Sequence, residues 1–308
     1  MAVFLATEDL PIRSASHFRL TAAGSESNVM AGLAMLGHRS RFATRVGNDG
    51  LGMAVIRRLR AIGVEVHAIV DDEKPTGVLV RDHPQLAPVE VCYARSGSAA
   101  SRFTWEDILP VLDPEPELMF LSGITPVLSA QAAAACQAAL TYAKQRAIRV
   151  VFDPNLRGKL MPVREAARLL RPFLEQADIV IAGAEELTAL TGARCHRSGA
   201  QQLLAGGAQT VVVKLGPRGA YGADSTDECE LGSMAASAVD PVGAGDAFAA
   251  GFLSGLLRER SLGDAMLEAT AVAACVVATR GDMEGLPSAI ERDALVAGRQ
   301  GGSDGVNR

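Results

Sequence analysis

The chain has 308 residues, of which 48% are hydrophobic and 21% are charged, and its formal net charge is -5. That length suits one large α/β domain, or a main domain with a small appendage. Because no long basic run occurs and the net charge is negative, we expect neither nucleic acid nor an anionic membrane as a partner.

The five cysteines occur singly, with no CxxC pair and no histidine at metal-ligand spacing from any of them. We therefore expect ordinary thiols in a reducing compartment. The first residues, MAVFLATEDL, contain no basic region and only a very short apolar stretch. We expect neither a signal peptide nor a membrane span there, and we expect the protein to be cytoplasmic.

The first patterned segments alternate apolar and polar residues, as exposed antiparallel strands do. They cover about residues 10–22 and 76–95, with Pro84 and Pro88 in an expected turn of the second segment. We interpret the two segments as a small β-sheet lid over one edge of a larger domain.

The rest of the chain alternates helical and strand patterns. We expect helices at 28–36 and 51–62, each followed by a glycine, at about 130–146 behind Ser129 as a cap, and at 246–257 and 262–279. Apolar runs at 150–152, 178–182 and 210–215 favour buried strands. This order predicts a mostly parallel sheet between two helical layers, a three-layer α/β/α domain over residues 1–297, and a disordered tail at 298–308.

The segment DPVGAGD, residues 240–246, precedes an apolar helix and is the sharpest functional signal. Its glycines permit a tight turn whose N–H groups point one way, and the helix dipole adds positive potential, so we expect an anion hole for a phosphoryl group. We expect Gly245 to require a positive φ. Gly243, Ala244, Gly245 and Asp246 are the candidate catalytic residues, with Asp246 as the general base. The alternative is a structural turn in which Asp246 only caps the helix.

This segment resembles the second signature of the ribokinase (PfkB) family, usually D-T-T-G-A-G-D. A first signature, AGSESN at 23–28 followed by Gly37 and by GNDGLG at 47–52, resembles the family's G-G-x-x-x-N and G-x-D-x-x-G. The resemblance spans roughly residues 20–290. It implies a ribokinase-like fold with a small lid and an ATP-dependent carbohydrate kinase that uses Mg²⁺, with K⁺ as a further candidate ion.

The resemblance also assigns a nucleotide side. KLGPRGA at 214–220 is similar to the family's K-x-G-x-x-G turn along ATP, although strand–turn–strand hairpins commonly look like this. The family's N-x-x-E motif, associated with Mg²⁺, falls on 183–186, where Glu186 is retained and Gly183 replaces the asparagine. The alternative for Glu186 is an ordinary acid at a helix start. Asp240 is the candidate for a monovalent cation. The candidate nucleotide-binding residues are Asn155, Arg157, Gly183, Lys214, Gly216, Gly219, Gly243 and Gly245.

Three further segments resemble the 2-keto-3-deoxygluconate kinases within that family: YARSGSAAS at 93–101, LSGIT at 121–125 and DPNLR at 153–157. The resemblance implies that arginines face the carboxylate of a sugar acid, for which a planar guanidinium fork is well suited. The alternative is that these arginines form surface ion pairs. The candidate substrate-binding residues are Gly24, Ser25, Asn28, Tyr93, Arg95, Arg157, Asp246 and Asp282.

Besides Gly183, the sequence departs from the family pattern at three further places. Residues 1–5 look like the end of the family's first strand, Ala23 replaces a glycine, and Thr270 stands where an asparagine is usual. Our hypothesis is phosphorylation of 2-keto-3-deoxygluconate at its 6-position by a homo-oligomer, a dimer through the lid. The alternatives are another sugar such as fructose, ribose or a related keto-deoxy acid, and a sensor that binds a sugar acid without turnover. A Rossmann dehydrogenase is disfavoured because no GxGxxG follows the first strand.

Overall fold

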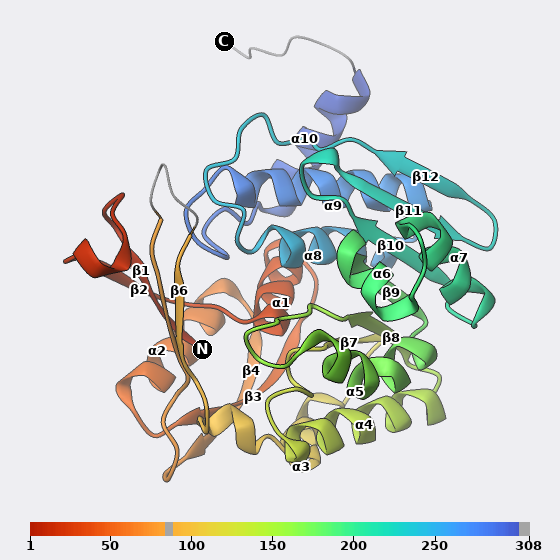
Figure 1. Ribbon diagram of the computed structural model, residues 1–308. Helices are drawn as coiled ribbons and strands as arrows, with labels where there is room; N and C mark the ends of the chain where they lie inside the picture. The colour runs from red at the N-terminus through yellow and green to blue at the C-terminus, as the bar shows by residue number, and fades with distance from the viewer. Residues whose placement is uncertain (84–88, 302–308) are drawn as a thin grey trace. The chain divides into compact units, whose positions relative to one another are not determined.

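The computed structural model describes residues 1–83 and 89–301 (Figure 1). Contacts divide the chain into two compact units. The first unit contains residues 1–27, 41–180 and 206–208, and the second contains residues 28–40, 181–205 and those from 209 onward. No helix among the described residues is long and apolar enough to cross a membrane.

Four strands of the first unit form a small sheet, which we call the lid sheet. It contains β1 (Ala2–Ala6), β2 (Phe18–Ala22), β5 (Val78–Arg81) and β6 (Val91–Ala94), in the order β2-β1-β5-β6. β1 runs antiparallel to β2 and parallel to β5, and β6 runs antiparallel to β5. The strands predicted within 10–22 and 76–95 are confirmed, although residues 12–14 form a 3-10 turn, η1 (Ile12–Ser14). The predicted turn at Pro84 and Pro88 lies outside the described residues.

A second element of the first unit is a parallel β–α–β segment made of β3 (Arg41–Gly47), α2 (Gly50–Ile62) and β4 (Glu65–Asp71). α2 begins behind Asp49, whose side chain accepts a hydrogen bond from the Gly52 N–H. It ends at Gly63, which has a φ of 103° and so stops the helix in a left-handed conformation. The predicted helix at 51–62 is confirmed.

The first unit also contains the parallel strands β7 (Leu118–Ser122), β8 (Arg149–Asp153) and β9 (Ile179–Gly183). α4 (Ala130–Gln145) and α5 (Val163–Gln176) lie side by side and both contact β8 (Figure 1). Ser129 caps α4 as predicted, because its side chain accepts a hydrogen bond from the Ala132 N–H. The short elements η2 (Ala99–Arg102), α3 (Trp105–Ile108) and η3 (Leu109–Val111) connect the lid sheet to β7.

The unit boundary falls inside β9, and the second unit contains β10 (Thr210–Lys214), β11 (Ala220–Asp224) and β12 (Glu228–Leu231). These last three strands pair antiparallel. The predicted parallel pairing is therefore confirmed for β7 to β9, whereas β10 to β12 pair antiparallel. The turn η4 (Gly216–Arg218) reverses the chain after β10, so no crossover helix intervenes. α6 (Ala184–Thr191) and α7 (His196–Ala205) precede β10.

Helices dominate the rest of the second unit. α8 (Ala244–Leu257) packs along α9 (Leu262–Val277), and Gly251 and Gly255 allow its backbone to approach Ala269 and Ala265 (Figure 1). α1 (Ser25–Met35) lies against α8 in the same way, since a Cβ on Gly32 would lie 2.5 Å from the Ala250 Cβ.

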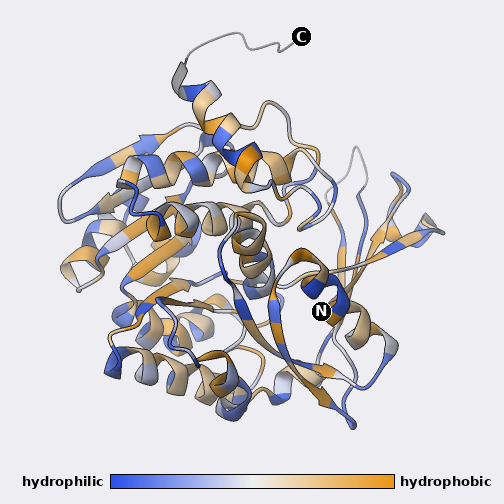
Figure 2. Ribbon diagram, turned by 180° about the vertical axis from the view of Figure 1, so that it is seen from behind, coloured by the Kyte–Doolittle hydropathy of each residue, from blue (hydrophilic) through white to orange (hydrophobic). Residues whose placement is uncertain are grey.

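The last helix is α10 (Ala289–Gly301), which mixes hydrophobic and hydrophilic residues (Figure 2). It includes residues 298–301, so the predicted disordered tail at 298–308 is wrong for its first four residues. Residues 302–308 lie outside the described part of the chain.

Candidate active site

The two signature motifs meet in the second unit through one side-chain contact. Asp246 lies in the first turn of α8 and is 9% exposed, and Asn28 of α1 is 3% exposed. The Asn28 side-chain amide Nδ2 donates a hydrogen bond of 2.8 Å to Asp246 Oδ2. The fold therefore orients a buried carboxylate at the mouth of a helix, where a general base is expected.

The turn before α8 differs in one detail from expectation. Gly243 is the residue with a positive φ, 85°, and it caps the helix. Gly245 lies within α8 and needs no positive φ, so the expectation for Gly245 is wrong. A Cβ on Gly243 would lie 2.5 Å from the backbone oxygen of Asp282. This close approach places Asp282 directly beside the turn.

Asp240 holds the other end of this turn. It is fully buried, and its Oδ1 accepts a hydrogen bond of 3.1 Å from the Val242 N–H. Its Oδ2 accepts one of 3.1 Å from the Gly281 N–H, which precedes Asp282. Asp240 therefore joins the turn to the segment after α9, and a role in binding a monovalent cation stays a prediction.

Lys214 adds a positive charge to the same place. Lys214 ends β10, and its Nζ lies 3.5 Å from the position of a Cβ on Gly245. The Lys214 ammonium group therefore lies close to the first N–H groups of α8, and this arrangement of positive charge and N–H donors favours a bound phosphate. Gly216 and Gly219 have φ values of 62° and 100°. A Cβ on Gly219 would collide with the backbone of Leu231, so this glycine also allows the turn after β10 to approach the end of β12.

Glu186 begins α6 and has a structural contact. Its Oε2 accepts a hydrogen bond of 2.7 Å from the Gly183 N–H, which is the cap position of the helix. Among the described residues, no group of three or more histidines, cysteines or acids could hold a metal ion. A protein-only metal cage is therefore absent from the described part of the chain, and the role of Glu186 toward Mg²⁺ stays a prediction.

Three sequence motifs meet in the first unit, at the ends of β7 and β8. Asn155 follows β8 with a φ of 42°, and its Nδ2 donates a hydrogen bond of 2.8 Å to Ser25 Oγ. Thr125, which follows β7, donates to Glu26 Oε1. Gly24, which directly precedes Ser25 in the chain, has a φ of 157°. Carboxyl ends of parallel strands are the usual place for a ligand in α/β folds.

Arg95 and Arg157 also belong to the first unit. The Arg95 guanidinium lies 4.5 Å from the centre of the Tyr93 ring, and its Nη1 lies 3.5 Å from Met1 Sδ. Burial lowers the pKa of Arg95, and the positive charge of Arg157 lowers it further, while Tyr93 and Glu26 oppose the shift. Guanidinium groups suit an anionic ligand, and a role of Arg95 and Arg157 in binding one stays a prediction.

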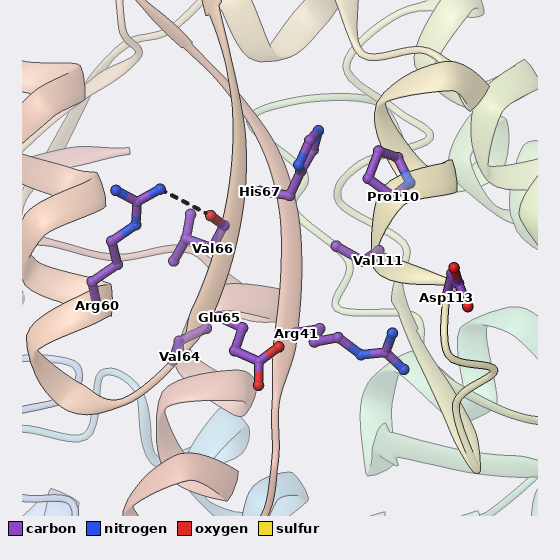
Figure 3. A pocket seen from close by; sticks show the side chains of 9 residues that line it. All are labelled: Arg41, Arg60, Val64, Glu65, Val66, His67, Pro110, Val111 and Asp113. Carbon is purple, nitrogen blue, oxygen red and sulfur yellow. Dashed lines mark hydrogen bonds between the residues drawn. The ribbon is translucent and has the colours of Figure 1, made fainter.

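A polar groove of the first unit lies apart from these residues. Figure 3 shows the groove, about 320 Å³ in volume, between β3 and β4 on one side and η3 on the other. Arg60 and Arg41 donate hydrogen bonds to the backbone oxygens of Val66 and Pro114. The groove is lined by Arg41, Arg60, Val64, Glu65, Val66, His67, Pro110, Val111 and Asp113, and none of these is a candidate residue of the sequence analysis.

Sequence reasoning missed Glu26. This carboxylate lies between Ser25 and Asn28 in the chain, accepts a hydrogen bond from Thr125 and, by its negative charge, raises the pKa of Arg95 against the effect of burial. The sequence signal that could have identified Glu26 is an acidic residue within a motif that otherwise consists of small or neutral residues. Its partner Thr125 belongs to LSGIT, a motif 99 positions away, so the pairing itself needed the fold.

Comparison with known proteins agrees with this geometry. The family model for pfkB family carbohydrate kinases matches residues 3–289. The chain is 35% identical over 292 residues to a 2-dehydro-3-deoxygluconokinase of Bacillus subtilis, covering 94% of this chain and 90% of that protein. It is 34% identical to the 2-dehydro-3-deoxygluconokinase of Thermoproteus tenax, covering 93% and 88%. The crystal structure of 2-dehydro-3-deoxygluconokinase from Thermotoga maritima matches with a TM-score of 0.85 and 25% identity, covering 97% and 96%.

Proposed function

Because the chain belongs to the pfkB family of carbohydrate kinases, we propose that it transfers a phosphoryl group from ATP to 2-keto-3-deoxygluconate, also called 2-dehydro-3-deoxygluconate. The product would be the 6-phosphate. The observation that carries the choice of a sugar acid is the identity of 34–35% to two 2-dehydro-3-deoxygluconokinases, together with the Arg95 guanidinium stacked on Tyr93 in the lid sheet motif. A carboxylate can bond both nitrogens of a guanidinium fork and neutralise its charge, whereas a neutral sugar brings no charge to it.

The chemical step assigns a role to the residues of the second unit. The substrate hydroxyl oxygen attacks the γ-phosphorus, a new O–P bond forms, and the bond from the γ-phosphorus to the β–γ bridging oxygen breaks to release ADP. Asp246 accepts the hydroxyl proton, and Asn28 holds its carboxylate in place through the hydrogen bond of 2.8 Å. The N–H groups at the start of α8 and the Lys214 ammonium stabilise the negative charge of the phosphoryl group.

Mg²⁺ fits this set of residues as a phosphate-bound ion, since protein sites commonly hold it through one or two carboxylates together with substrate phosphates and water. Glu186 is the carboxylate that we propose for it, and Mg²⁺ would neutralise charge on the ATP phosphates. Asp240 remains our proposal for a K⁺ site, where the ion would support the turn before α8.

A panel of substrates in an assay of ADP release tests the proposal. We expect kcat/KM to be highest for 2-keto-3-deoxygluconate and much lower for fructose and ribose. The second candidate is another sugar of the same family, and it would be favoured by equal or better turnover of a neutral sugar. If the protein binds a sugar acid but phosphorylates none of the substrates in the presence of ATP and Mg²⁺, the sensor hypothesis is favoured instead.

A further inference from the structure

The motif Gly47-Asn48-Asp49-Gly50-Leu51-Gly52 takes no part in the chemistry proposed above. Asp49 Oδ1 accepts hydrogen bonds from the Gly52 N–H at 2.7 Å and from Thr76 Oγ1 at 2.8 Å. Its Oδ2 accepts one from the Thr76 N–H at 2.8 Å. The carboxylate thus caps α2 and also holds a residue that lies 27 positions further along the chain.

The two outer glycines of the motif serve this contact with Thr76. A Cβ on Gly47 would lie 2.5 Å from Asp49 Oδ2 and 2.6 Å from the Thr76 backbone nitrogen. A Cβ on Gly52 would lie 2.5 Å from the Gly47 oxygen and 2.8 Å from Thr76 Oγ1. In addition, the Gly47 N–H donates a hydrogen bond of 2.9 Å to Thr76 Oγ1. Because a helix cap alone would need neither glycine, the motif is built around Thr76.

Thr76 stands at the base of the lid sheet. Its neighbour Pro75 accepts a backbone hydrogen bond of 2.9 Å from Ala99, just beyond β6. Its other neighbour, Gly77, accepts one of 3.0 Å from Ala2 at the start of β1. The segment 75–77 therefore ties together β1, the start of β5 and the chain that leaves β6.

The same segment supports Arg95. A Cβ on Gly77 would lie 3.2 Å from the Arg95 Cβ, so the Arg95 side chain begins directly against the Gly77 backbone. A shift of Thr76 would move Gly77 and with it the origin of a side chain whose guanidinium is stacked on Tyr93. Misplacing a binding group by about 1 Å can reduce turnover about 100-fold.

We propose that Asp49 is a positioning residue for substrate recognition: through Thr76 and Gly77 it fixes the base of the lid sheet and the direction in which Arg95 leaves β6. This role rests on the proposed function, in which Arg95 binds the substrate carboxylate. Burial by itself raises the pKa of Asp49, but the hydrogen bonds from Thr76 and Gly52 outweigh burial and hold the pKa below its usual value. The carboxylate is consequently ionised at neutral pH, and its bonds to Thr76 are charge-assisted.

The test compares Asp49→Asn, Thr76→Val and Thr76→Ser with wild type. In Asp49→Asn, the amide N–H₂ would face a hydrogen-bond donor of Thr76 in place of a carboxylate oxygen. Thr76→Val would remove the hydroxyl group, and Thr76→Ser would keep it. We expect the first two variants to raise the KM for 2-keto-3-deoxygluconate about 10-fold or more, with the KM for ATP within about twofold of wild type. Thr76→Ser should behave like wild type.

Hydrogen exchange supplies a readout that needs no substrate. In the first two variants we expect faster exchange of amides in β5 and β6, and unchanged exchange in α8 and α9. Ser261→Ala is the matched control, because Ser261 caps α9 through a hydrogen bond of 3.2 Å from the Asp264 N–H and lies in the other unit. That variant should lose stability without a change in the KM for the sugar acid.

Two results would overturn the role of Asp49: unchanged lid exchange in both variants, or an equal rise in both KM values. If Asp49→Asn fails to fold, the comparison of Thr76→Val with Thr76→Ser decides the question. If the wild-type enzyme phosphorylates only neutral sugars, the sugar-acid function fails, and lid exchange still reports on the contact between Asp49 and Thr76.

Discussion

Asn28 and Asp246 lie 218 positions apart in the chain, and the Asn28 side-chain amide donates a hydrogen bond of 2.8 Å to the Asp246 carboxylate. This hydrogen bond holds the carboxylate in one orientation. The contact also ties α1 to the first turn of α8, so the N-terminal motif orients the carboxylate that we propose as the general base.

The first prediction concerns Asp246→Asn. The amide keeps the size of the side chain but cannot accept a proton at neutral pH, so we expect kcat to fall about 10²- to 10⁴-fold. ATP affinity, measured by titration calorimetry, should be retained. Asp264→Asn is the matched control, because Asp264 lies exposed in the first turn of α9 and has no assigned role. A variant of Asp246 that keeps most of its kcat would remove it from the base role.

The second prediction separates two glycines of one turn. The Cβ position of Gly245 is in ordinary contact with Lys214, whereas a side chain on Gly243 would meet the Asp282 backbone and require a φ of 85°. We therefore expect Gly245→Val to fold normally and to lose kcat about 100-fold or more, since its branches occupy the space beside the Lys214 ammonium. Gly243→Val should lower the unfolding free energy by about 1–3 kcal/mol from strain alone. Equal thermal stability of the two variants would contradict this distinction.

The sequence predicted helix ends correctly where the end is set by a capping residue only a few positions away. Ser129 caps α4 and Gly63 ends α2, as the sequence indicated, because both devices act within a few residues of the helix end. The start of α8 at the GAGD turn follows the same logic. Within that turn, however, the helix begins two residues earlier than expected. The residue with a positive φ is therefore Gly243, and not Gly245 as predicted.

Side-chain contacts between residues far apart in the chain could not be predicted from the sequence. The contact of Asp49 with Thr76 and that of Glu26 with Thr125 join residues that no periodicity relates. The antiparallel pairing of β10 with β11 was indicated only as the hairpin alternative for residues 214–220. A buried strand of the type TVVVK looks alike whether its next neighbour arrives through a helix or through a tight turn, and here the η4 turn decides.

The third prediction concerns substrate recognition by Arg95 and Arg157. If either binds the carboxylate, its replacement by alanine should reduce kcat/KM for 2-keto-3-deoxygluconate far more than for fructose. Losing a charge-assisted bond costs about 1.5–3 kcal/mol, or about 10- to 150-fold. A defect confined to the KM for ATP would instead assign that arginine to the phosphates, and an unchanged ratio of the two kcat/KM values in both variants would refute carboxylate binding.

The fourth prediction concerns stability in the second unit. Arg292 of α10 has a side chain that is 3% exposed, and its Nη1 lies 3.5 Å from Glu268 Oε2. Nη1 also donates a hydrogen bond of 2.9 Å to Ser254. Removing Arg292 leaves Glu268 its ion pair of 3.0 Å with Arg258 but deprives the buried Ser254 hydroxyl of a donor, so we expect Arg292→Ala to lose about 1–3 kcal/mol in urea unfolding.

Arg171 provides the control for this measurement. It forms an exposed pair with Glu175 one turn away, and its side chain is 74% exposed. Exposed pairs of this kind contribute about 0.3–0.5 kcal/mol, so Arg171→Ala should be nearly neutral. Similar losses in the two variants would show that the Arg292 contacts add little to stability.

The last prediction concerns self-association through the lid sheet. The register places Leu20, Phe4, Val80 and Cys92 in one row across its four strands. The row lies on the face opposite Val3, Leu5 and Leu79, which form a buried cluster, because side chains alternate along a strand.

Leu20 is 43% exposed and Cys92 is also exposed, so this row presents an apolar stripe that a second copy of the chain would cover. We expect light scattering to give a dimer mass for the wild-type protein at micromolar concentration, and a monomer mass for Leu20→Glu, because a carboxylate cannot be buried in an apolar interface without a partner. Ile290→Glu is the control, since Ile290 on α10 is 83% exposed and lies outside the lid sheet, so this variant should remain a dimer. A monomer mass for the wild-type protein would rule out the lid dimer, and a dimer that survives Leu20→Glu would place the interface elsewhere.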